Sequence, residues 1–308
     1  MRLLVEISPH LKQKYDTGWV MKQVVFSLVP VVIASVVFFR LRAVLLVSVC
    51  IIGCLLSEVL VNRLRKRAST LSDYSAVVTG MLLAFLLPPK IPLWAAFLAA
   101  AVAILVGKQI FGGLGQNIFN PALVARAFLM AAFPVMLTSW VNPFNLEAVT
   151  QATPLALWKF SHQFVSLEKL FLGNVPGSLG ETSSIAIILG GLYLILRGVA
   201  CWRAPLGMFV GLSALSGIFY LKSPLNGSVF FHLFSGGAML GMFFMVTDPV
   251  TTPVTKSGRF IFGLFVGILV VIIRKWAGLP EGVMYSILFM NAFVPLINKL
   301  TKPKSFGR

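Results

Sequence analysis

The chain has 308 residues, of which 58% are hydrophobic and only 11% are charged, and its mean hydropathy is +0.91. Soluble domains carry about 25% charged residues, so this composition excludes a soluble globular protein. The net charge of +17 comes from basic residues clustered between apolar runs. This is the pattern of charges that flank membrane spans, and it argues against nucleic acid as a partner.

The segment that precedes the first apolar run is polar. Lys12, Lys14, Asp16 and Lys22 all lie within the first 23 residues. A secretory signal peptide needs an apolar core and a cleavage site of small residues, and this segment has neither. We therefore expect no cleavable signal peptide.

Apolar runs of membrane-spanning length recur along the chain. A helix that crosses about 30 Å of hydrocarbon needs roughly 20 apolar residues. By this measure the sequence predicts an all-α polytopic membrane protein, a single transmembrane domain over residues 1–308 with ten helices. The predicted spans are 23–39, 43–61, 74–89, 92–110, 119–137, 183–201, 204–220, 229–247, 259–275 and 281–298. The third and the eighth are rich in Gly, Ser and Thr and close with proline, so each can be broken or re-entrant.

The ten spans divide into two halves, residues 1–137 and 183–308, with five spans in each. The segment Gly80–Leu82 in the first half is similar to Gly237–Leu240 in the second. An odd number of spans in each half would place the second copy upside down, and inverted repeats place functional sites near their pseudo-twofold axis. Two inverted five-helix repeats are one interpretation of this match, and coincidence among Gly-rich apolar segments is the other.

The Lys and Arg residues of the connections predict the orientation in the membrane. If both termini are cytoplasmic, the inside segments hold seventeen of these residues, Lys108 among them, and the outside segments hold eight, Arg274 among them. An excess of basic residues on the inside is the usual bias of membrane proteins. We therefore expect cytoplasmic N and C termini. The long connection 138–182 then lies outside the cytoplasm, and we expect at least one short helix in it.

Ionisable residues inside or at the ends of spans are costly to bury and are candidates for function. They are Glu58, Asp73, Arg126 and Asp248. For Glu58, the simpler interpretation is that its side chain extends towards the basic run 63–67 at the end of its span. Arg126 lies well inside a span, so we expect a buried partner such as a carboxylate or the carbonyl groups of a helix end.

Motifs of soluble enzymes and of metal sites are missing from the sequence. The three histidines are scattered, and there is no Walker loop or dinucleotide-binding motif. Cys50, Cys54 and Cys201 lie within or beside apolar runs without the spacing of metal ligands. We expect these cysteines to be small buried apolar residues.

Three polar segments rich in turn-forming residues interrupt the apolar chain: 112–123, 147–155 and 247–255. Taken alone, each is typical of an ordinary loop. In the second segment, Thr153 followed by Pro154 is typical of a helix N-cap followed by the first helical residue.

Taken together and in order, the polar segments match a known family. The matching motifs are Ser72-Asp73-Tyr74-Ser75, Leu87-Pro88-Pro89, Lys108-Gln109-Ile110-Phe111-Gly112-Gly113-Leu114-Gly115, Asn120-Pro121-Ala122-Leu123, Thr247-Asp248-Pro249-Val250-Thr251, Pro280-Glu281-Gly282 and Asn291-Ala292-Phe293. They cover most of the chain, and the chain resembles the D subunit of the Rnf complex and its relative, the B subunit of the sodium-pumping NADH:quinone reductase. The short segment before the first span favours the first of these two.

The resemblance implies a covalently bound flavin. In that family an Asp-x-x-Ser/Thr-x-Ala-Thr motif attaches flavin mononucleotide (FMN) through its phosphate to the hydroxyl of the final Thr. By position this residue is Thr153, and Glu147, Thr150 and Ala152 fill the other places of the motif. Glu147 stands where Asp is usual, and Gln151 stands where a small residue is common. The flavin transferase that acts on such motifs works outside the cytoplasm, in agreement with the side expected for the long connection.

The resemblance also implies a function. It predicts a subunit of a redox-driven ion pump in the bacterial cytoplasmic membrane that relays electrons between ferredoxin and NAD, coupled to movement of Na⁺ or H⁺. The implied partners are the other membrane and peripheral Rnf subunits and the extracytoplasmic flavin transferase. A second, non-covalent flavin such as riboflavin is implied without a location.

Two alternatives to this function remain open. One is a component similar to the B subunit of the sodium-pumping reductase. The other is a flavin-free channel or transporter, since inverted five-helix repeats also build solute channels. We also expect the Gly-rich junctions 112–121 and 278–282 to line the central pathway for electrons or ions.

Overall fold

The computed structural model describes residues 16–67, 70–143, 152–181 and 183–303. Within these ranges the regular secondary structure is helical throughout, which confirms the all-α class. The elements fall into an N-terminal group, two short helices in the long connection, and a C-terminal group.

Prolines lie at the ends or starts of several helices in the N-terminal group. Its elements are α1 (Thr17–Phe39), α2 (Leu41–Leu64), the 3₁₀ turn η1 (Leu71–Asp73), α3 (Ser75–Leu86), α4 (Leu93–Ile104), the π-helical continuation η2 (Leu105–Gln109), α5 (Pro121–Ala132) and α6 (Pro134–Leu137). Helix α3 ends before Pro88 because proline lacks an N–H group and disfavours helical conformation in the residue before it. Helix α5 begins with Asn120 as N-cap and Pro121 in the first turn.

The remaining elements follow the long connection. They are α7 (Pro154–Ser161) and α8 (Leu167–Leu172) within it, then α9 (Ser184–Leu196), α10 (Arg203–Lys222), the 3₁₀ turn η3 (Pro224–Asn226), α11 (Val229–Phe234), α12 (Ala238–Leu240), the π-helical turn η4 (Gly241–Met245), α13 (Lys256–Trp276) and α14 (Val283–Leu300). The short helices α7 and α8 confirm the helical content expected for the long connection.

Several of these helices have the length and composition of membrane spans. Helices α1, α2, α10, α13 and α14 are long and apolar enough to cross a membrane, and the bent pair 224–234 and 238–245 is a sixth candidate. Four shorter apolar helices, at 75–86, 93–109, 121–132 and 184–196, lie where other spans are predicted. These helices indicate a polytopic membrane protein, while the number of ten spans and the inverted repeat stay predictions.

The eighth predicted span is broken, as its composition suggests. Helix α11 and the following helical segment are bent by 49° at Ser235–Gly237. Gly236 has a φ of +62°, a conformation that residues with a Cβ adopt only at a cost. Carbonyl groups freed at this break are paired, because Arg274 of α13 donates to the oxygens of His232 and Ser235, the latter at 2.9 Å.

Two of the basic residues that were counted in the connections to predict the orientation have buried side chains. Lys108 is 2% exposed and Arg274 is fully buried, whereas the count places them on the inside and the outside, respectively. Their removal takes one residue from each side, so the excess of basic residues on the inside is unchanged. The orientation therefore stays a prediction on the same argument.

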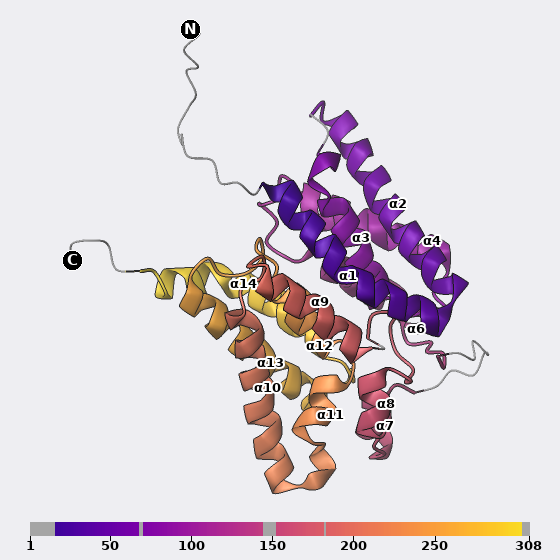
Figure 1. Ribbon diagram of the computed structural model, residues 1–308, viewed down its shortest axis with the longest axis vertical. Helices are drawn as coiled ribbons and strands as arrows, with labels where there is room; N and C mark the ends of the chain where they lie inside the picture. The colour runs from indigo at the N-terminus through magenta and orange to yellow at the C-terminus, as the bar shows by residue number, and fades with distance from the viewer. Residues whose placement is uncertain (1–15, 68–69, 144–151, 182, 304–308) are drawn as a thin grey trace.

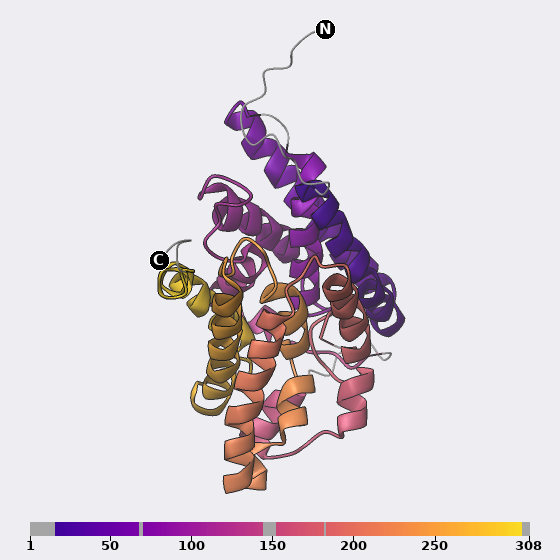
Figure 2. The ribbon, with the colours of Figure 1, turned by 60° about the vertical axis from the view of Figure 1, so that its left-hand side comes forward.

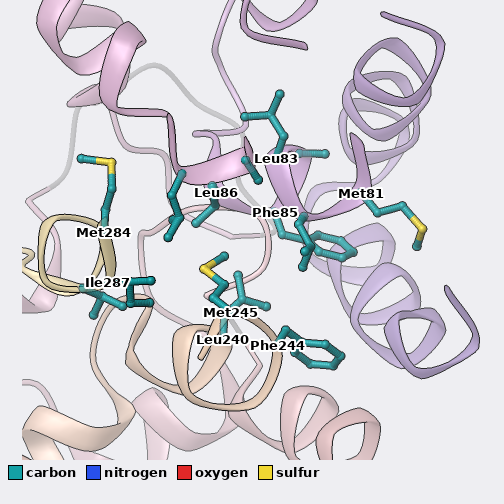
Figure 3. Close-up of a cluster of buried hydrophobic side chains, with 14 of the residues drawn as sticks. Met81, Leu83, Phe85, Leu86, Leu240, Phe244, Met245, Met284 and Ile287 are labelled. Atoms are coloured by element: carbon teal, nitrogen blue, oxygen red, sulfur yellow. The ribbon is translucent and has the colours of Figure 1, made fainter. Parts of the chain in front are cut away.

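The two groups of helices lie side by side and share a hydrophobic core. Helices α1 to α4, in indigo and purple, form one group, and α9 to α14 form the other (Figures 1 and 2). Between them, one buried apolar cluster includes Phe85 of α3, Leu240 of α12, Phe244 of η4 and Ile287 of α14 (Figure 3). In both ribbon views α7 and α8 lie towards the end of the molecule opposite the α2–α3 connection.

Helices α10 and α13 pack backbone to backbone. The surface between them includes four glycines, two on each helix at a spacing of four residues: Gly207, Gly211, Gly263 and Gly267. A Cβ atom on Gly263 would lie 2.1 Å from the Ala204 carbonyl oxygen, and one on Gly211 would lie 2.1 Å from the Leu264 carbonyl oxygen. Small residues at such spacing let apolar helices approach closely where water cannot drive their association.

The substitution Gly263→Ala is expected to destabilise the protein. The new methyl group would meet a backbone carbonyl that cannot move without separating α10 from α13, and overpacking of this kind costs about 1–3 kcal/mol. The midpoint of thermal unfolding in detergent should fall relative to wild type. Gly278→Ala is the matched control, since no heavy atom lies within 4 Å of its added Cβ. Equal midpoints for the two variants would contradict the proposed close contact.

Candidate functional site: buried charges and a cavity beside Thr153

A buried ion pair joins α2 to the π-helical turn after α4. Lys108 Nζ lies 2.7 Å from Glu58 Oε1, and the two side chains are 2% and 0% exposed. The Thr70 hydroxyl donates to the same Glu58 oxygen at 2.5 Å, and Lys108 donates to the Ser75 hydroxyl at 2.6 Å. The expectation that Glu58 extends towards the basic run 63–67 is therefore wrong.

Glu58 points inward because of its position around the α2 axis. Cys50, Cys54 and Asn62 stand at intervals of four residues from it and are all buried, and residues four apart share one helix face. The two cysteines are thus small buried residues, as expected, and Cys201 is half-buried.

Three polar motifs that are far apart in the sequence meet in one hydrogen-bond network. Asp248 accepts from the Asn120 side-chain amide at 3.4 Å and from the Thr251 hydroxyl at 3.0 Å. Asn291 of α14, in the amide orientation that pairs both of its ends, accepts from the Asn120 N–H and donates to the Thr251 carbonyl, each at 3.2 Å. The motifs therefore supply one another with the partners that buried polar groups require.

A small cavity of about 70 Å³ lies beside this network. Asn120 and Asp248 line it together with Ser75 and Lys108, so the Gly-rich junction 112–121 does contribute to an internal space. The cavity is well below the range of roughly 300–1,000 Å³ that is usual for ligand pockets. Asp73 is not part of the lining; it accepts hydrogen bonds from the N–H and hydroxyl groups of Ser75, at 2.8 and 2.5 Å, at the start of α3.

Arg126 has the buried carboxylate partner that its position predicts. Its Nη2 lies 2.6 Å from Glu281 Oε2, in the connection between α13 and α14, and its Nη1 lies 3.5 Å from Glu181 Oε1, in the connection between α8 and α9. Glu281 also accepts from the Gly237 N–H, at 2.9 Å, at the break between α11 and α12. The cluster therefore joins both groups of helices and the long connection.

A larger cavity of about 400 Å³ borders this charged cluster, with Arg126, Glu181 and Glu281 among its lining residues. Its other walls are mainly aromatic and aliphatic, and Thr153 is also one of its lining residues. Residues that contribute to these walls include Trp140, Phe160, Phe234, Leu279, Met284 and Tyr285. An apolar cavity with a few convergent polar groups is the usual form of a ligand site.

Thr153 is the N-cap of α7. Its hydroxyl accepts from the Ala156 N–H at 3.2 Å, and Pro154 occupies the first turn of the helix. This confirms the cap predicted from the Thr-Pro pair. Thr153 is half-buried and its neighbour Ala152 is exposed, while Glu147 and Thr150 lie outside the described residues.

Two side chains of α7 fix its position. Lys159 Nζ donates to the carbonyl oxygens of Arg274, Ala277 and Leu279 at the C-terminal end of α13, at 2.9 Å for the first and 3.2 Å for the last. Trp158 Nε1 donates to the Leu225 carbonyl at 2.9 Å. A cation at a helix C-terminus satisfies otherwise unpaired carbonyl groups and is favoured by the helix dipole, so these contacts hold α7, and with it Thr153, beside the cavity.

The sequence assigned no role to Glu181 or Glu281. The signal that could have identified them is scarcity: the chain has only nine acidic residues, and a buried Arg needs at least one of them. The choice among the nine depends on contacts between residues 55 and 155 positions apart, which local spacing does not reveal.

Apolar helices with buried charges paired between them, and a capping Thr beside a largely apolar cavity, define a polytopic membrane protein with an internal ligand-sized site. The particular family follows from comparison with known proteins. The chain belongs to the NQR2, RnfD, RnfE family, whose model matches residues 4–307. This confirms the resemblance seen in the sequence motifs.

Curated relatives match over essentially the whole chain. The D subunit of the Na⁺-translocating ferredoxin:NAD⁺ oxidoreductase complex of Acetobacterium woodii is 42% identical over all of this chain and 96% of its own length. The D subunit of the proton-translocating ferredoxin:NAD⁺ oxidoreductase complex of Clostridium ljungdahlii is 40% identical over 98% of this chain and 96% of its own length. The D subunit of the ion-translocating oxidoreductase complex of Vibrio cholerae serotype O1 (strain M66-2) is 36% identical over the full length of both chains.

Removal of the charge on Lys108 is expected to destabilise the protein strongly. Lys108→Met would leave the Glu58 carboxylate buried without a countercharge, and the loss of one partner from a buried pair costs about 3–5 kcal/mol. The midpoint of thermal unfolding in detergent should drop. The double variant Lys108→Met/Glu58→Gln should recover most of this decrease, because no unpaired charge is left buried. A double variant as unstable as the single one would show that the pair itself is not the cause.

Lys159→Met is expected to loosen α7. The loss of charged hydrogen bonds to the end of α13 should speed hydrogen–deuterium exchange of the amides of residues 157–161 by roughly tenfold or more, the factor that corresponds to about 1.4 kcal/mol. Lys169→Met in the neighbouring α8 is the control and should leave this exchange unchanged. Unaltered exchange in the Lys159 variant would mean that other contacts fix α7.

Proposed function

We propose that this chain is the membrane subunit of an Rnf-type ion-translocating oxidoreductase and that Thr153 carries FMN as a phosphate ester. The subunit relays electrons between ferredoxin and NAD, coupled to movement of Na⁺ or H⁺. It lies in the bacterial cytoplasmic membrane with both termini in the cytoplasm and Thr153 on the opposite side. The family membership and the functions in the names of the relatives support the complex and the coupling to ion movement.

The position of Thr153 is the observation that carries the flavin proposal. The residue that the attachment motif selects is also one of the residues that line the cavity of about 400 Å³. That volume falls within the range of about 300–1,000 Å³ that is typical of ligand pockets. Trp140, Phe234 and Tyr285 in the walls offer aromatic faces against which a planar ring can pack.

The surroundings of Thr153 also suit a phosphate. A phosphate ester on an N-cap hydroxyl lies next to the free N–H groups and the positive end of the helix dipole, which favour negative charge by about 0.3–1 kcal/mol at exposed sites. Arg126 also lines the cavity, and its guanidinium is paired with Glu181 and Glu281.

The flavin supplies the redox chemistry, which the Thr153 hydroxyl does not provide by itself. The contribution of the protein is to hold and shield that group: the ester fixes it to α7, Lys159 fixes α7 to the end of α13, and the apolar walls exclude water. Its electron partners are the neighbouring membrane and peripheral subunits of the complex, and an extracytoplasmic flavin transferase attaches the flavin. The second, non-covalent flavin such as riboflavin remains part of the proposal without an assigned place.

The alternative functions make different use of the same cavity. A protein similar to the B subunit of the sodium-pumping reductase would carry the same flavin on Thr153 and differ in its partners. A flavin-free channel or transporter would use the cavity for a solute and leave the Thr153 hydroxyl free. Full-length similarity to subunits named as parts of ion-translocating oxidoreductases favours the redox function.

Thr153→Ala is expected to abolish covalent flavin binding. When the chain is co-expressed with a flavin transferase, the denatured wild-type protein should fluoresce as a flavin-containing band in a gel, and the variant should not, because it lacks the oxygen that forms the ester. Mass spectrometry of the peptide that contains Thr153 should show the mass of FMN in wild type.

Two controls make this experiment specific. Thr150→Ala alters the same motif and Thr138→Ala removes another hydroxyl that lines the cavity, and both should keep the fluorescent band. An unmodified Thr153 peptide from active complex, or accessibility labelling that places Thr153 in the cytoplasm, would overturn the flavin proposal and favour a channel.

A further inference from the structure

Glu181 is the carboxylate of the charged cluster with the weakest set of partners. Its hydrogen bonds to Arg126 Nη1 and to the Ser178 N–H are long, at 3.5 and 3.4 Å, and its side chain also bonds to that of Glu281. Those of Glu281 are short, 2.6 Å from Arg126 Nη2 and 2.9 Å from the Gly237 N–H. Arg126 therefore neutralises Glu281 first, and Glu181 keeps the less stabilised negative charge.

The environment of Glu181 favours its neutral form. It lies in the connection between α8 and α9, outside the helical spans, and its side chain is only 6% exposed. The charged groups around it are Arg126 of α5, Glu281 after α13 and Arg274 of α13. Burial, and next the adjacent Glu281 carboxylate, raise the pKa of Glu181 to about 7, so a small change in local charge is enough to change its protonation.

Such a change in charge is expected in this cavity. Glu181 and Thr153 line the same cavity, so a flavin esterified to Thr153 and bound in that cavity would lie near the Glu181 carboxylate. Negative charge added to a flavin ring in a poorly solvated cavity costs free energy unless a positive charge enters with it. Arg126 and Arg274 are already engaged, the first with two carboxylates and the second with two backbone carbonyl groups.

We propose that Glu181 takes up one proton when the flavin on Thr153 accepts one electron, so that the net charge of the cavity stays constant. The electron comes from a reduced one-electron carrier in a neighbouring subunit, which is oxidised in the step, and the proton comes from hydronium or a buffer acid in the solvent and binds a Glu181 carboxylate oxygen. When the electron leaves for an oxidised one-electron carrier in a neighbouring subunit, which is reduced, the proton returns to the solvent base. This inference rests on the proposed function, because it requires a flavin at Thr153.

Infrared difference spectroscopy of the purified complex tests the inference. Reduced-minus-oxidised spectra, with dithionite as the reductant, should contain a positive band in the carbonyl-stretch region of protonated carboxylic acids, and the band should shift in heavy water. The band should be lost in Glu181→Gln, which has no carboxyl group to protonate. Glu181→Asp should keep a band at an altered frequency, and this also provides the test if the Gln variant does not assemble.

Two further variants locate the proton. Glu168→Gln, an exposed residue of α8, is the matched control and should leave the spectrum unchanged. If the band disappears in Glu281→Gln and persists in Glu181→Gln, the proton binds Glu281 and the inference is wrong.

Flavin content separates this inference from the function on which it rests. Each preparation is checked for the covalent fluorescent band of the chain. A flavin on Thr153 without any infrared band that depends on Glu181 overturns the present inference alone. No flavin on Thr153 in wild type overturns the proposed function, and the inference with it.

Discussion

The burial of the Arg126 guanidinium among apolar helices is the constraint on which much of this structure depends. A charged side chain removed from water must be paired, and Arg126 is paired with carboxylates from two different connections, Glu181 and Glu281. Because Glu281 in turn accepts from the Gly237 N–H, the same cluster satisfies one side of the helix break. Arg274 satisfies the carbonyl groups on the other side. A broken helix inside an apolar body is therefore possible here because nearby charges replace the missing backbone partners.

Pairing across the molecule also accounts for how far the sequence could predict the structure. Features set by neighbouring residues were predictable: the apolar helices follow from composition, and the cap at Thr153 follows from a Thr-Pro pair. Features set by distant residues were not. The basic run 63–67 lies close to Glu58 in the sequence and predicts that its side chain extends towards this run, but its partner is Lys108, 50 residues away. The spacing of Glu58 from Cys50 and Cys54 places the three residues on one helix face, and this face is the buried one.

The polar motifs that identify the family have a structural explanation that is independent of the family. Asn120, Asp248 and Asn291 bond to one another or to the same backbone, so each of the three requires the others if no buried polar group is to be left unpaired. The attachment motif differs from these, because Thr153 forms only a local cap and has an open cavity beside it. A residue whose hydroxyl is not needed to hold distant helices together is free to be modified, and this distinction separates the structural polar residues from the candidate cofactor site.

The glycine contact between α10 and α13 has a consequence for motion. Two helices whose backbones touch have few intervening side chains that could change rotamer, so they move as one body. Through Lys159 the C-terminal end of this pair holds the helix that begins after Thr153. A group carried on Thr153 would therefore keep a constant distance from the α10–α13 pair, and the distance over which an electron tunnels to it would not vary with motion of the short and bent helices nearby.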